Sequence, residues 1–207
     1  MVSLRDLGVK HMLRRILEET MLRHLFLTRQ FIIYEKQLVD LDNLNLRNPH
    51  LEFSFISEDS HEILQQIEEL NGISQDFVTK KLVDGGECLV ATDTARLAGF
   101  NLVSYGDIYM HYLERNLMLS NSEVWSEQIF ASQPYRQAGV ATDLRHIMFH
   151  HLAKKGYTKL IGGYLPYNVG AGILAKNLAF VEKEKVTLVK IFGWKKYLVH
   201  RLPQDTK

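Results

Sequence analysis

The stretch Pro134-Tyr-Arg-Gln-Ala-Gly-Val-Ala-Thr142 joins a strand-like run to a helix-like run through a short basic turn that contains a glycine. The run before it, Val124 to Ala131, is rich in the branched and aromatic residues that favour strands. After it, apolar residues recur at helical spacing from Val140 up to Gly156, a typical helix C-cap. The free N–H groups at the positive start of such a helix favour an anion, and phosphate is the obvious one.

Within this stretch, Arg136-Gln-Ala-Gly139-Val-Ala141 matches the pattern Arg/Gln-x-x-Gly-x-Gly/Ala. Here the sequence resembles the GNAT superfamily of acyl-CoA-dependent N-acetyltransferases. A second segment agrees, because Asn168-Val-Gly-Ala171 and the run Leu174 to Phe180 are similar to the family's Asn-initiated helix, which ends in Lys-x-Leu-Gly-Phe. Ala179 stands where that family usually has Gly. The resemblance covers roughly residues 51 to 201, in the expected order.

The apolar periodicity predicts the other elements of this region. The expected strands are Leu51 to Ile56, the hairpin of Cys88 to Asp93 and Arg96 to Ser104, Thr158 to Tyr164, Val186 to Phe192 and Trp194 to His200. Two helices are expected from Ser60 to Asn71 and from Ser74 to Leu82, and the resemblance places them beside the acceptor pocket. The implied fold class is α/β (α+β), with a mixed, mostly antiparallel central sheet flanked by helices.

The chain has 207 residues, of which 46% are hydrophobic and 24% charged, as is usual for one globular domain. We therefore expect a single domain, with an N-terminal extension over 1–50 ahead of a shared core over 51–201. The extension reads as an amphipathic helix from Ser3 to Leu25, a strand from Arg29 to Leu38 and a loop from Asp40 to His50. Packing on its own sheet is the simplest role for the helix, and membrane contact or a homodimer interface are the alternatives.

The composition excludes several classes of partner. The formal net charge is +1, from 25 basic and 24 acidic residues that are spread along the chain, so a nucleic-acid partner is not expected. The first 25 residues are too charged for a secretory signal, and no window resembles a membrane span. Cys88, the single cysteine, lies in an apolar run where a buried, inert thiol is expected. A cytoplasmic protein is the resulting expectation.

Acyl transfer to an amine needs a base that takes a proton from the nitrogen. The strand before the turn offers Glu123 and Glu127, and strand alternation puts Glu127 on one face with Trp125 and Ile129. In the family, the catalytic carboxylate of this strand lies an even number of residues before the strand ends. The resemblance therefore implies Glu127 as the catalytic base, although a surface glutamate on a strand face remains the alternative.

The resemblance also implies the residues that bind acetyl-CoA or another acyl-CoA. Backbone groups at the end of the strand are expected to meet the oxyanion and the pantetheine arm, and N–H groups of the turn are expected to hold the pyrophosphate. A glycine in the turn allows close approach of the phosphates, and an arginine adds charge. The implied cofactor-binding residues are Ile129, Phe130, Ala131, Arg136, Gln137, Ala138, Gly139, Val140, Ala141, Thr142 and Asn168.

No metal is expected. His146 and His150 have the i,i+4 spacing of a zinc pair, but Ile147 occupies the position of the glutamate in His-Glu-x-x-His. The family commonly carries a tyrosine, proposed to protonate the departing thiolate, where this chain has Ala175. Solvent, Tyr164 or Tyr167 then has to supply that proton, and the vacated space is expected to admit acyl chains longer than acetyl.

The resulting hypothesis is an N-acetyltransferase that moves an acetyl or short acyl group from acyl-CoA directly to a primary amine on a small molecule or peptide. Two alternatives stay open: an N-acyl amino acid synthase-like enzyme that uses acyl carrier protein, and a non-catalytic acyl-CoA-binding module. The segment Tyr105 to Arg115 is long enough to be a binding loop that contacts the acceptor, or else a purely structural excursion.

Overall fold

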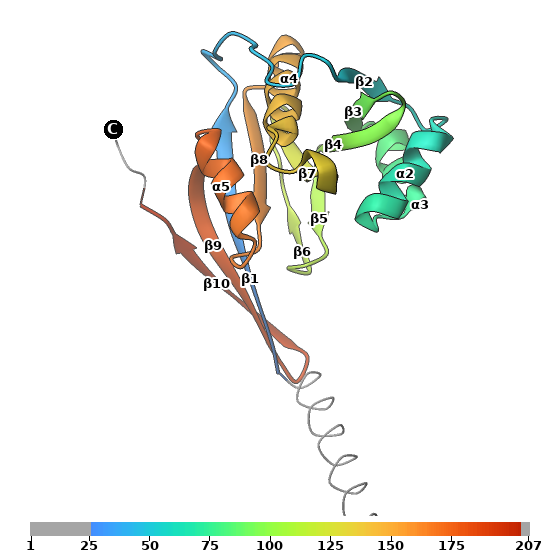
Figure 1. Cartoon of the computed structure of the whole chain (residues 1–207). Helices are drawn as coiled ribbons and strands as arrows, with labels where there is room; N and C mark the ends of the chain where they lie inside the picture. Colours follow the sequence, from blue (N-terminus) through green and yellow to red (C-terminus); the bar gives the residue numbers. More distant parts are fainter. Residues whose placement is uncertain (1–25, 204–207) are drawn as a thin grey trace, which may run out of the picture.

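The computed structural model describes residues 26–203 and is built on one eight-stranded sheet (Figure 1). Its strand order is β10-β9-β1-β8-β7-β4-β3-β2, and a separate two-stranded sheet pairs β5 with β6. The strands are β1 (Phe26–Gln37), β2 (Glu52–Ile56), β3 (Glu87–Asp93), β4 (Arg96–Tyr105), β5 (Ile108–Met110), β6 (Arg115–Leu117), β7 (Glu123–Ala131), β8 (Lys159–Tyr164), β9 (Val181–Ile191) and β10 (Trp194–Arg201). The helices are α2 (His61–Asn71), α3 (Gln75–Val83), α4 (Val140–Lys154) and α5 (Val169–Asn177), and a short 3₁₀ turn covers Gln133–Tyr135.

Strands β7 and β8 form the one parallel pair among the described strands, and they separate after only three register positions. The pairing ends at Trp125 and Ile161, after which β7 follows β4 as far as Ala131 and β8 follows β1 as far as Tyr164. Beyond this point β7 stays paired with β4 and β8 stays paired with β1, while the edges of β7 and β8 that face each other have no strand partner. This opening lies in the middle of the sheet, between its two antiparallel halves.

Strand β1 lies inside the sheet, antiparallel to β8 on one edge and to β9 on the other. The strand expected from Arg29 to Leu38 thus forms, three residues longer at its start, and takes an interior position. The helix expected from Ser3 to Leu25 lies outside the described residues. The division into an extension and a shared core stays a prediction, although the strand of that extension is built into the centre of the sheet.

Helices α4 and α5 lie over one face of the sheet (Figure 1), where a cluster of buried apolar residues joins them to it. A buried guanidinium reinforces this packing, because Arg145 of α4 is 1% exposed and donates to the side chains of Asn101 on β4, at 3.1 Å, and Ser126 on β7, at 2.6 Å. Ser126 directly follows the last residue of β7 that pairs with β8. The contact therefore fixes α4 to the sheet where the opening begins.

Two smaller apolar clusters occupy the other face. Helices α2 and α3 cover β3 and β4, with Leu64, Ile67 and Val78 buried. The hairpin of β5 and β6 covers β1, β7 and β9, with Ile108 and Trp125 in its cluster. The segment expected as a long polar connection thus contains a small sheet of its own, whose alternating buried residues the sequence analysis missed.

The predicted fold class is confirmed, since the sheet is mixed, mostly antiparallel and flanked by helices. The predicted boundaries hold within a few residues, except that β9 begins at Val181, five residues before the expected Val186. Within residues 26–203, none of the helices is both long enough and apolar enough to cross a bilayer.

Candidate functional site

The turn between β7 and α4 has the backbone geometry that an anion site needs. Gly139 is the N-cap of α4 with φ 91°, and Gln137 before it has φ 66°. Within the described residues, the backbone N–H groups of Gly139, Val140, Ala141 and Thr142 donate no hydrogen bond. Four free donors at the positive end of a 15-residue helix are what the sequence analysis expected of this turn.

A loop of the N-terminal region clamps this turn in place. The buried carboxylate of Asp143 accepts hydrogen bonds from the backbone N–H groups of Arg47, at 3.0 Å, and Asn48, at 2.9 Å, and from the Asn48 side chain at 2.8 Å. The Asn48 amide also donates to the carbonyl of Ala138 at 3.0 Å. The negative charge of Asp143 is therefore stabilised by donors of this loop. Its position in the first turn of α4 also stabilises the start of the helix.

The backbone conformation of Gly139 favours glycine, and the Arg47 side chain packs closely against it. The positive φ of Gly139 disfavours any side chain, and a Cβ on it would lie 2.6 Å from Cδ of Arg47. The Arg47 side chain thus crosses directly over the glycine while remaining exposed. Sequence reasoning found Gly139 from its motif but missed Arg47 and Asn48, because a contact across roughly 90 residues leaves no local signal.

Arg136 turns back toward the end of β7. Its Nε donates to the carbonyl of Ala131 at 3.4 Å, and its guanidinium lies 6.0 Å from the centre of the Phe130 ring. The predicted residues Ile129, Phe130 and Ala131 form the last part of β7, where the strand has separated from β8. The structure therefore brings together the end of β7, Arg136 and the free N–H groups of the turn.

Asn168 and Tyr164 lie at the start of α5 and the end of β8. The Asn168 side-chain oxygen caps α5 by accepting from the N–H of Ala171 at 3.1 Å, so its side-chain NH₂ remains for other contacts. The Tyr164 hydroxyl donates to Glu182, and burial, aided by this carboxylate, raises the pKa of Tyr164. The hydroxyl therefore keeps its proton at neutral pH.

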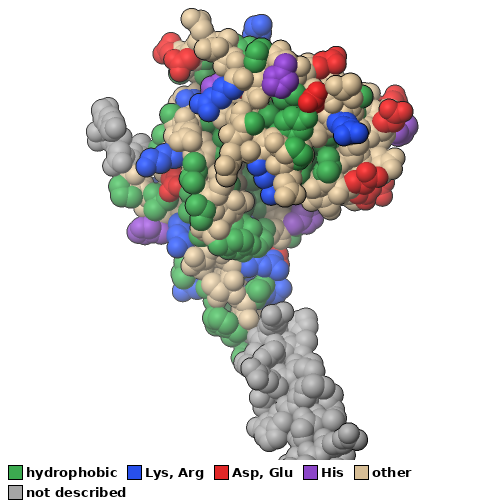
Figure 2. Space-filling model, in the orientation of Figure 1, with side chains coloured by type: hydrophobic (Ala, Val, Ile, Leu, Met, Phe, Trp, Pro, Cys, Tyr) green, Lys and Arg blue, Asp and Glu red, His purple; other side chains and the backbone are tan. Residues whose placement is uncertain are grey.

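Figure 2 shows the charges on the face that carries α4 and α5. Asp and Glu side chains are gathered at the right and at the upper left, whereas Lys and Arg side chains are most frequent over the middle and the lower left. The side of the face nearer α4 and α5 is thus the more favourable one for an anionic ligand.

Glu127 lies on β7, four residues before the end of the strand, and its side chain points to the face opposite α4. Its Oε1 accepts hydrogen bonds from the Lys81 ammonium and, at 2.8 Å, from the Ser104 hydroxyl. Only 12% of the Glu127 side chain is exposed, so the contacts occur in a largely dehydrated setting. Among residues 26–203, none donates a hydrogen bond to Oε2, and Glu127 lines the adjoining pocket.

A pocket of about 470 Å³ opens beside Glu127, between the two apolar clusters of this face. Helix α3 and the two residues before it form one side, the β5 strand with the turn after it forms another, and β1 and β7 form the floor. It is lined by Phe31, Ile73, Ser74, Phe77, Lys81, Ile108, Tyr109, Met110, His111, Tyr112, Trp125, Glu127 and Gln128. Its size is in the range of pockets for small molecules.

The other titratable residues singled out from the sequence lie in structural roles. Glu123 accepts from Lys159 at 2.9 Å and from the Ser120 N–H at 3.0 Å, and the Ser120 hydrogen bond, with Lys159, lowers the pKa of Glu123. Burial raises the pKa of the Cys88 thiol to about 12, as expected for an inert cysteine. Within the described part of the chain, no group of three His, Cys, Asp or Glu side chains is placed to hold a metal.

Comparison with known proteins identifies the fold of this chain. No protein-family model and no curated protein sequence matches the chain. A GCN5-related N-acetyltransferase from Sphaerobacter thermophilus is similar with a TM-score of 0.59 and 14% identity, over 94% of this chain and 59% of that one. The GCN5-related glucosamine N-acetyltransferase region of a fungal multi-domain GH3 β-N-acetylglucosaminidase gives a TM-score of 0.61 at 11% identity, over 84% of this chain and 22% of that one.

A protein of unknown function from Staphylococcus epidermidis gives a TM-score of 0.55 at 12% identity, over 84% of this chain and 66% of its own. The chain spans 57%, 66% and 59% of the lengths of the first three structures that it matches. It therefore has the fold of the GCN5-related N-acetyltransferases, the GNAT fold, as the motif around Gly139 predicts.

Proposed function

We propose that the protein is an acyl-CoA-dependent N-acyltransferase that moves an acetyl or short acyl group to a primary amine. The observation that carries the proposal is the course of β7. The strand separates from β8 after Trp125, passes Glu127 beside an apolar pocket on one face of the sheet, and ends at Ala131, eight residues before Gly139 of the anion-favouring turn. One strand thus links a carboxylate to a phosphate site across an opening in the sheet.

The donor is an acyl-CoA. Its pyrophosphate binds the N–H groups of Gln137 and of Gly139 to Thr142, with charge from Arg136, while the N–H of Ala138 donates to the Tyr135 carbonyl at 3.3 Å. Its pantetheine arm lies along the free edge of β7 at Ile129 to Ala131 and reaches Asn168 on the other side of the opening. Backbone donors at the strand edge meet the developing oxyanion, which is where preorganised N–H groups stabilise acyl transfer most.

The amine enters from the pocket and attacks the thioester carbonyl. A nitrogen–carbon bond forms and the carbon–sulfur bond breaks, while the proton lost by the amine passes to Glu127, directly or through a water. The thiolate takes up a proton from solvent, because the Tyr164 hydroxyl donates to Glu182 and holds its proton too tightly, and free coenzyme A leaves. Lys81 holds Glu127 in place beside the acceptor.

Coenzyme A binding is tested by a substitution that spares the helix. Thr142 is the third residue of α4, where a glutamate favours the helix start but places a negative charge beside the pyrophosphate. At roughly 100 times the dissociation constant, coenzyme A stabilises the natural protein by about 2.7 kcal/mol, which raises its melting temperature. Thr142→Glu is expected to lose that shift, and Thr142→Gln, of equal size, to keep it.

Turnover is tested by thiol release from acetyl-CoA in the presence of amines. Release that depends on the amine, together with a coenzyme A shift lost only in Thr142→Glu, supports the proposal. A shift without any turnover favours the binding module instead. Turnover with an acyl carrier protein but no response to coenzyme A favours the synthase-like enzyme, because that donor carries no pyrophosphate.

A further inference from the structure

The pocket beside Glu127 is lined mainly by aromatic and other apolar side chains. Trp125 on β7 and Ile108 on β5 are 6% and 5% exposed, while Tyr109 next to Ile108 is 49% exposed. Phe31 on β1 and Phe77 on α3 also line the pocket. An apolar ligand that enters such a pocket removes both its own surface and these side chains from water, which favours binding in proportion to the area buried.

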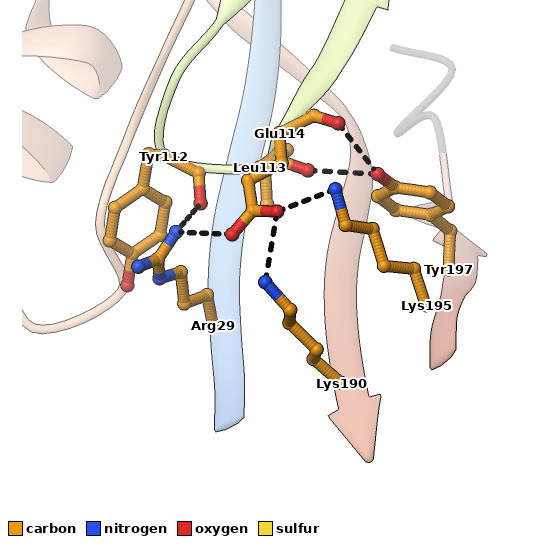
Figure 3. A network of polar contacts seen from close by, with 7 residues as sticks. All are labelled: Arg29, Tyr112, Leu113, Glu114, Lys190, Lys195 and Tyr197. Carbon is orange, nitrogen blue, oxygen red and sulfur yellow. Dashed lines mark hydrogen bonds and ion pairs between the residues drawn. The ribbon is translucent and has the colours of Figure 1, made fainter. Parts of the chain in front are cut away.

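The wall that carries Tyr109 and Tyr112 is held by a polar network (Figure 3). Glu114, just after this wall, accepts from Arg29 at 3.4 Å, Lys190 at 3.4 Å and Lys195 at 2.6 Å. The bonded partners come from three strands of the main sheet, β1, β9 and β10.

Backbone carbonyls complete the network. The Tyr197 hydroxyl donates to the carbonyls of Leu113, at 3.0 Å, and Glu114, at 2.9 Å, and Arg29 donates to that of Tyr112 at 3.0 Å (Figure 3). Arg29 also lies 5.5 Å from the centre of the Tyr112 ring. With its turn fixed at so many points, the aromatic wall is a preformed surface, which lowers the ordering cost of binding.

The charges of the lining limit which amines fit. Glu127 is the one carboxylate among the described residues that line the pocket, and Lys81 already pairs with it. An acceptor with several ammonium groups would therefore bring more positive charge than the pocket can neutralise, at a cost in desolvation. An acceptor with one amino group needs only one carboxylate.

We propose that the acceptor is a primary amine carried on an aromatic or bulky apolar body of small-molecule size. This inference rests on the N-acyltransferase function proposed above and names the substrate class of that site. The apolar body lies against Tyr109, Trp125 and Phe77, and the amino group reaches Glu127. The transfer then joins the nitrogen to the acyl carbon, releases coenzyme A as the thiol, and leaves an apolar amide.

Binding is measured without turnover through Trp125. The chain has two tryptophans, and Trp194 is 86% exposed on β10, away from the pocket, so Trp194→Phe leaves Trp125 as the sole reporter. Titration of this full-length variant with 2-phenylethylamine is expected to change Trp125 emission and to saturate. Spermidine and ethanolamine are expected to need at least about tenfold higher concentrations, because they bury little apolar surface. Equal or tighter binding of spermidine overturns the inference.

Turnover separates this inference from the function on which it rests. In the thiol-release assay, kcat/KM for 2-phenylethylamine is expected to exceed that for ethanolamine roughly 10- to 100-fold, the worth of burying one ring. Tyr109→Ser is expected to reduce this ratio, while Phe192→Ser, which removes an exposed ring on the β9–β10 turn, leaves it unchanged. Preference for ethanolamine or spermidine overturns the substrate class and keeps the acyltransferase. Release of the thiol at the same rate with and without an amine overturns both the substrate class and the acyltransferase function.

Discussion

The two sides of the sheet opening are assembled in different ways. On the donor side, the turn and the start of α4 come from one stretch, residues 131 to 142, and act mainly through backbone N–H groups. On the acceptor side, the pocket draws its side chains from β1, the start of α3, the β5 turn and β7, which are distant in sequence. A short pattern can therefore specify the first site, whereas the second exists only once the fold has formed.

This contrast means that the two sides should fail independently. A change in the turn affects the binding of the donor and spares the pocket, while a change at Glu127 affects the chemistry and spares the donor. Strand β7 belongs to both sides, since Glu127 and Ile129 are two residues apart on it. The substitutions below are ordered from the largest expected effect to the smallest.

The largest effect is expected for Glu127→Gln, which keeps the shape of the side chain but removes the base. We expect turnover to fall by roughly 10²- to 10⁴-fold, the usual contribution of a general base. Coenzyme A should still raise the melting temperature, because Glu127 faces the acceptor side. Glu184→Gln is the matched control, because the Glu184 carboxylate on β9 pairs with Arg115 on β6 and does not line the pocket. Equal rates and superimposed pH–rate profiles for Glu127→Gln and the natural protein would remove Glu127 from the mechanism.

The next effect concerns the loop that clamps the donor side. Asp143→Ala leaves the N–H groups of Arg47 and Asn48 without their acceptor, and each lost bond to a charged, buried partner matters. We expect a loss of roughly 2–4 kcal/mol in the free energy of unfolding in urea, together with weaker coenzyme A binding. Asp107→Ala, at an exposed position, serves as the control. If Asp143→Ala is as stable as the control, the loop does not hold the turn.

The far end of α4 is tied down by a second carboxylate. Glu87 on β3 accepts from His151 at 2.6 Å and Tyr105 at 2.8 Å, and pairs with Lys155 at 2.5 Å. Burial alone would raise the pKa of Glu87, but the hydrogen bonds from Lys155, Tyr105 and His151 together outweigh it and lower the pKa.

A group with a lowered pKa stabilises the fold above the pKa of the unfolded chain and loses that contribution as the pH falls through its own. We therefore expect stability to decline below about pH 4.3, the ordinary value for glutamate, and Glu87→Gln to show a shallower decline. Urea midpoints measured from pH 3 to 7 check this. Parallel curves of urea midpoint against pH for the two proteins would show that Glu87 contributes nothing to the loss of stability at acid pH.

The residues of the donor side could largely be predicted from the sequence, whereas those of the acceptor side could not. The pattern from Arg136 to Ala141 located the turn, and Glu127 does lie on the pocket face with Trp125. The parity that also put Ile129 on that face is wrong, because the register of β7 against β4 shifts between Ser126 and Gln128, and Ile129 packs with the cluster under α4 instead. The contacts of Asn48 and Glu114 were missed, because each joins segments whose closeness depends on the whole sheet. The position of β1 between β8 and β9 was missed for the same reason, since periodicity predicts a strand but not its neighbours.

The smallest effect concerns the length of the donor acyl group. Ala175, where the resembling family commonly has tyrosine, is 5% exposed and lines a hollow of about 520 Å³. Gly172 and Phe180 line the same hollow, and a Cβ on Gly172 would lie 3.3 Å from the Tyr164 ring and hydroxyl. Tyr164 thus packs closely over Gly172, and the hollow lies next to Ala175 on the neighbouring part of α5.

We expect propionyl-CoA or longer donors to be used at least as well as acetyl-CoA, because the hollow at Ala175 accepts the extra methylenes. Each methylene buried is worth about 0.8 kcal/mol, or roughly fourfold in kcat/KM. Ala175→Tyr should fill the space and restore a preference for acetyl, whereas Ala175→Ser, close to alanine in size, should leave the donor preference unchanged. Measurement of kcat/KM across donors of increasing length decides between these outcomes. A steep fall beyond acetyl in the natural protein would show that the acyl group points away from α5, toward the side of the opening that faces the pocket.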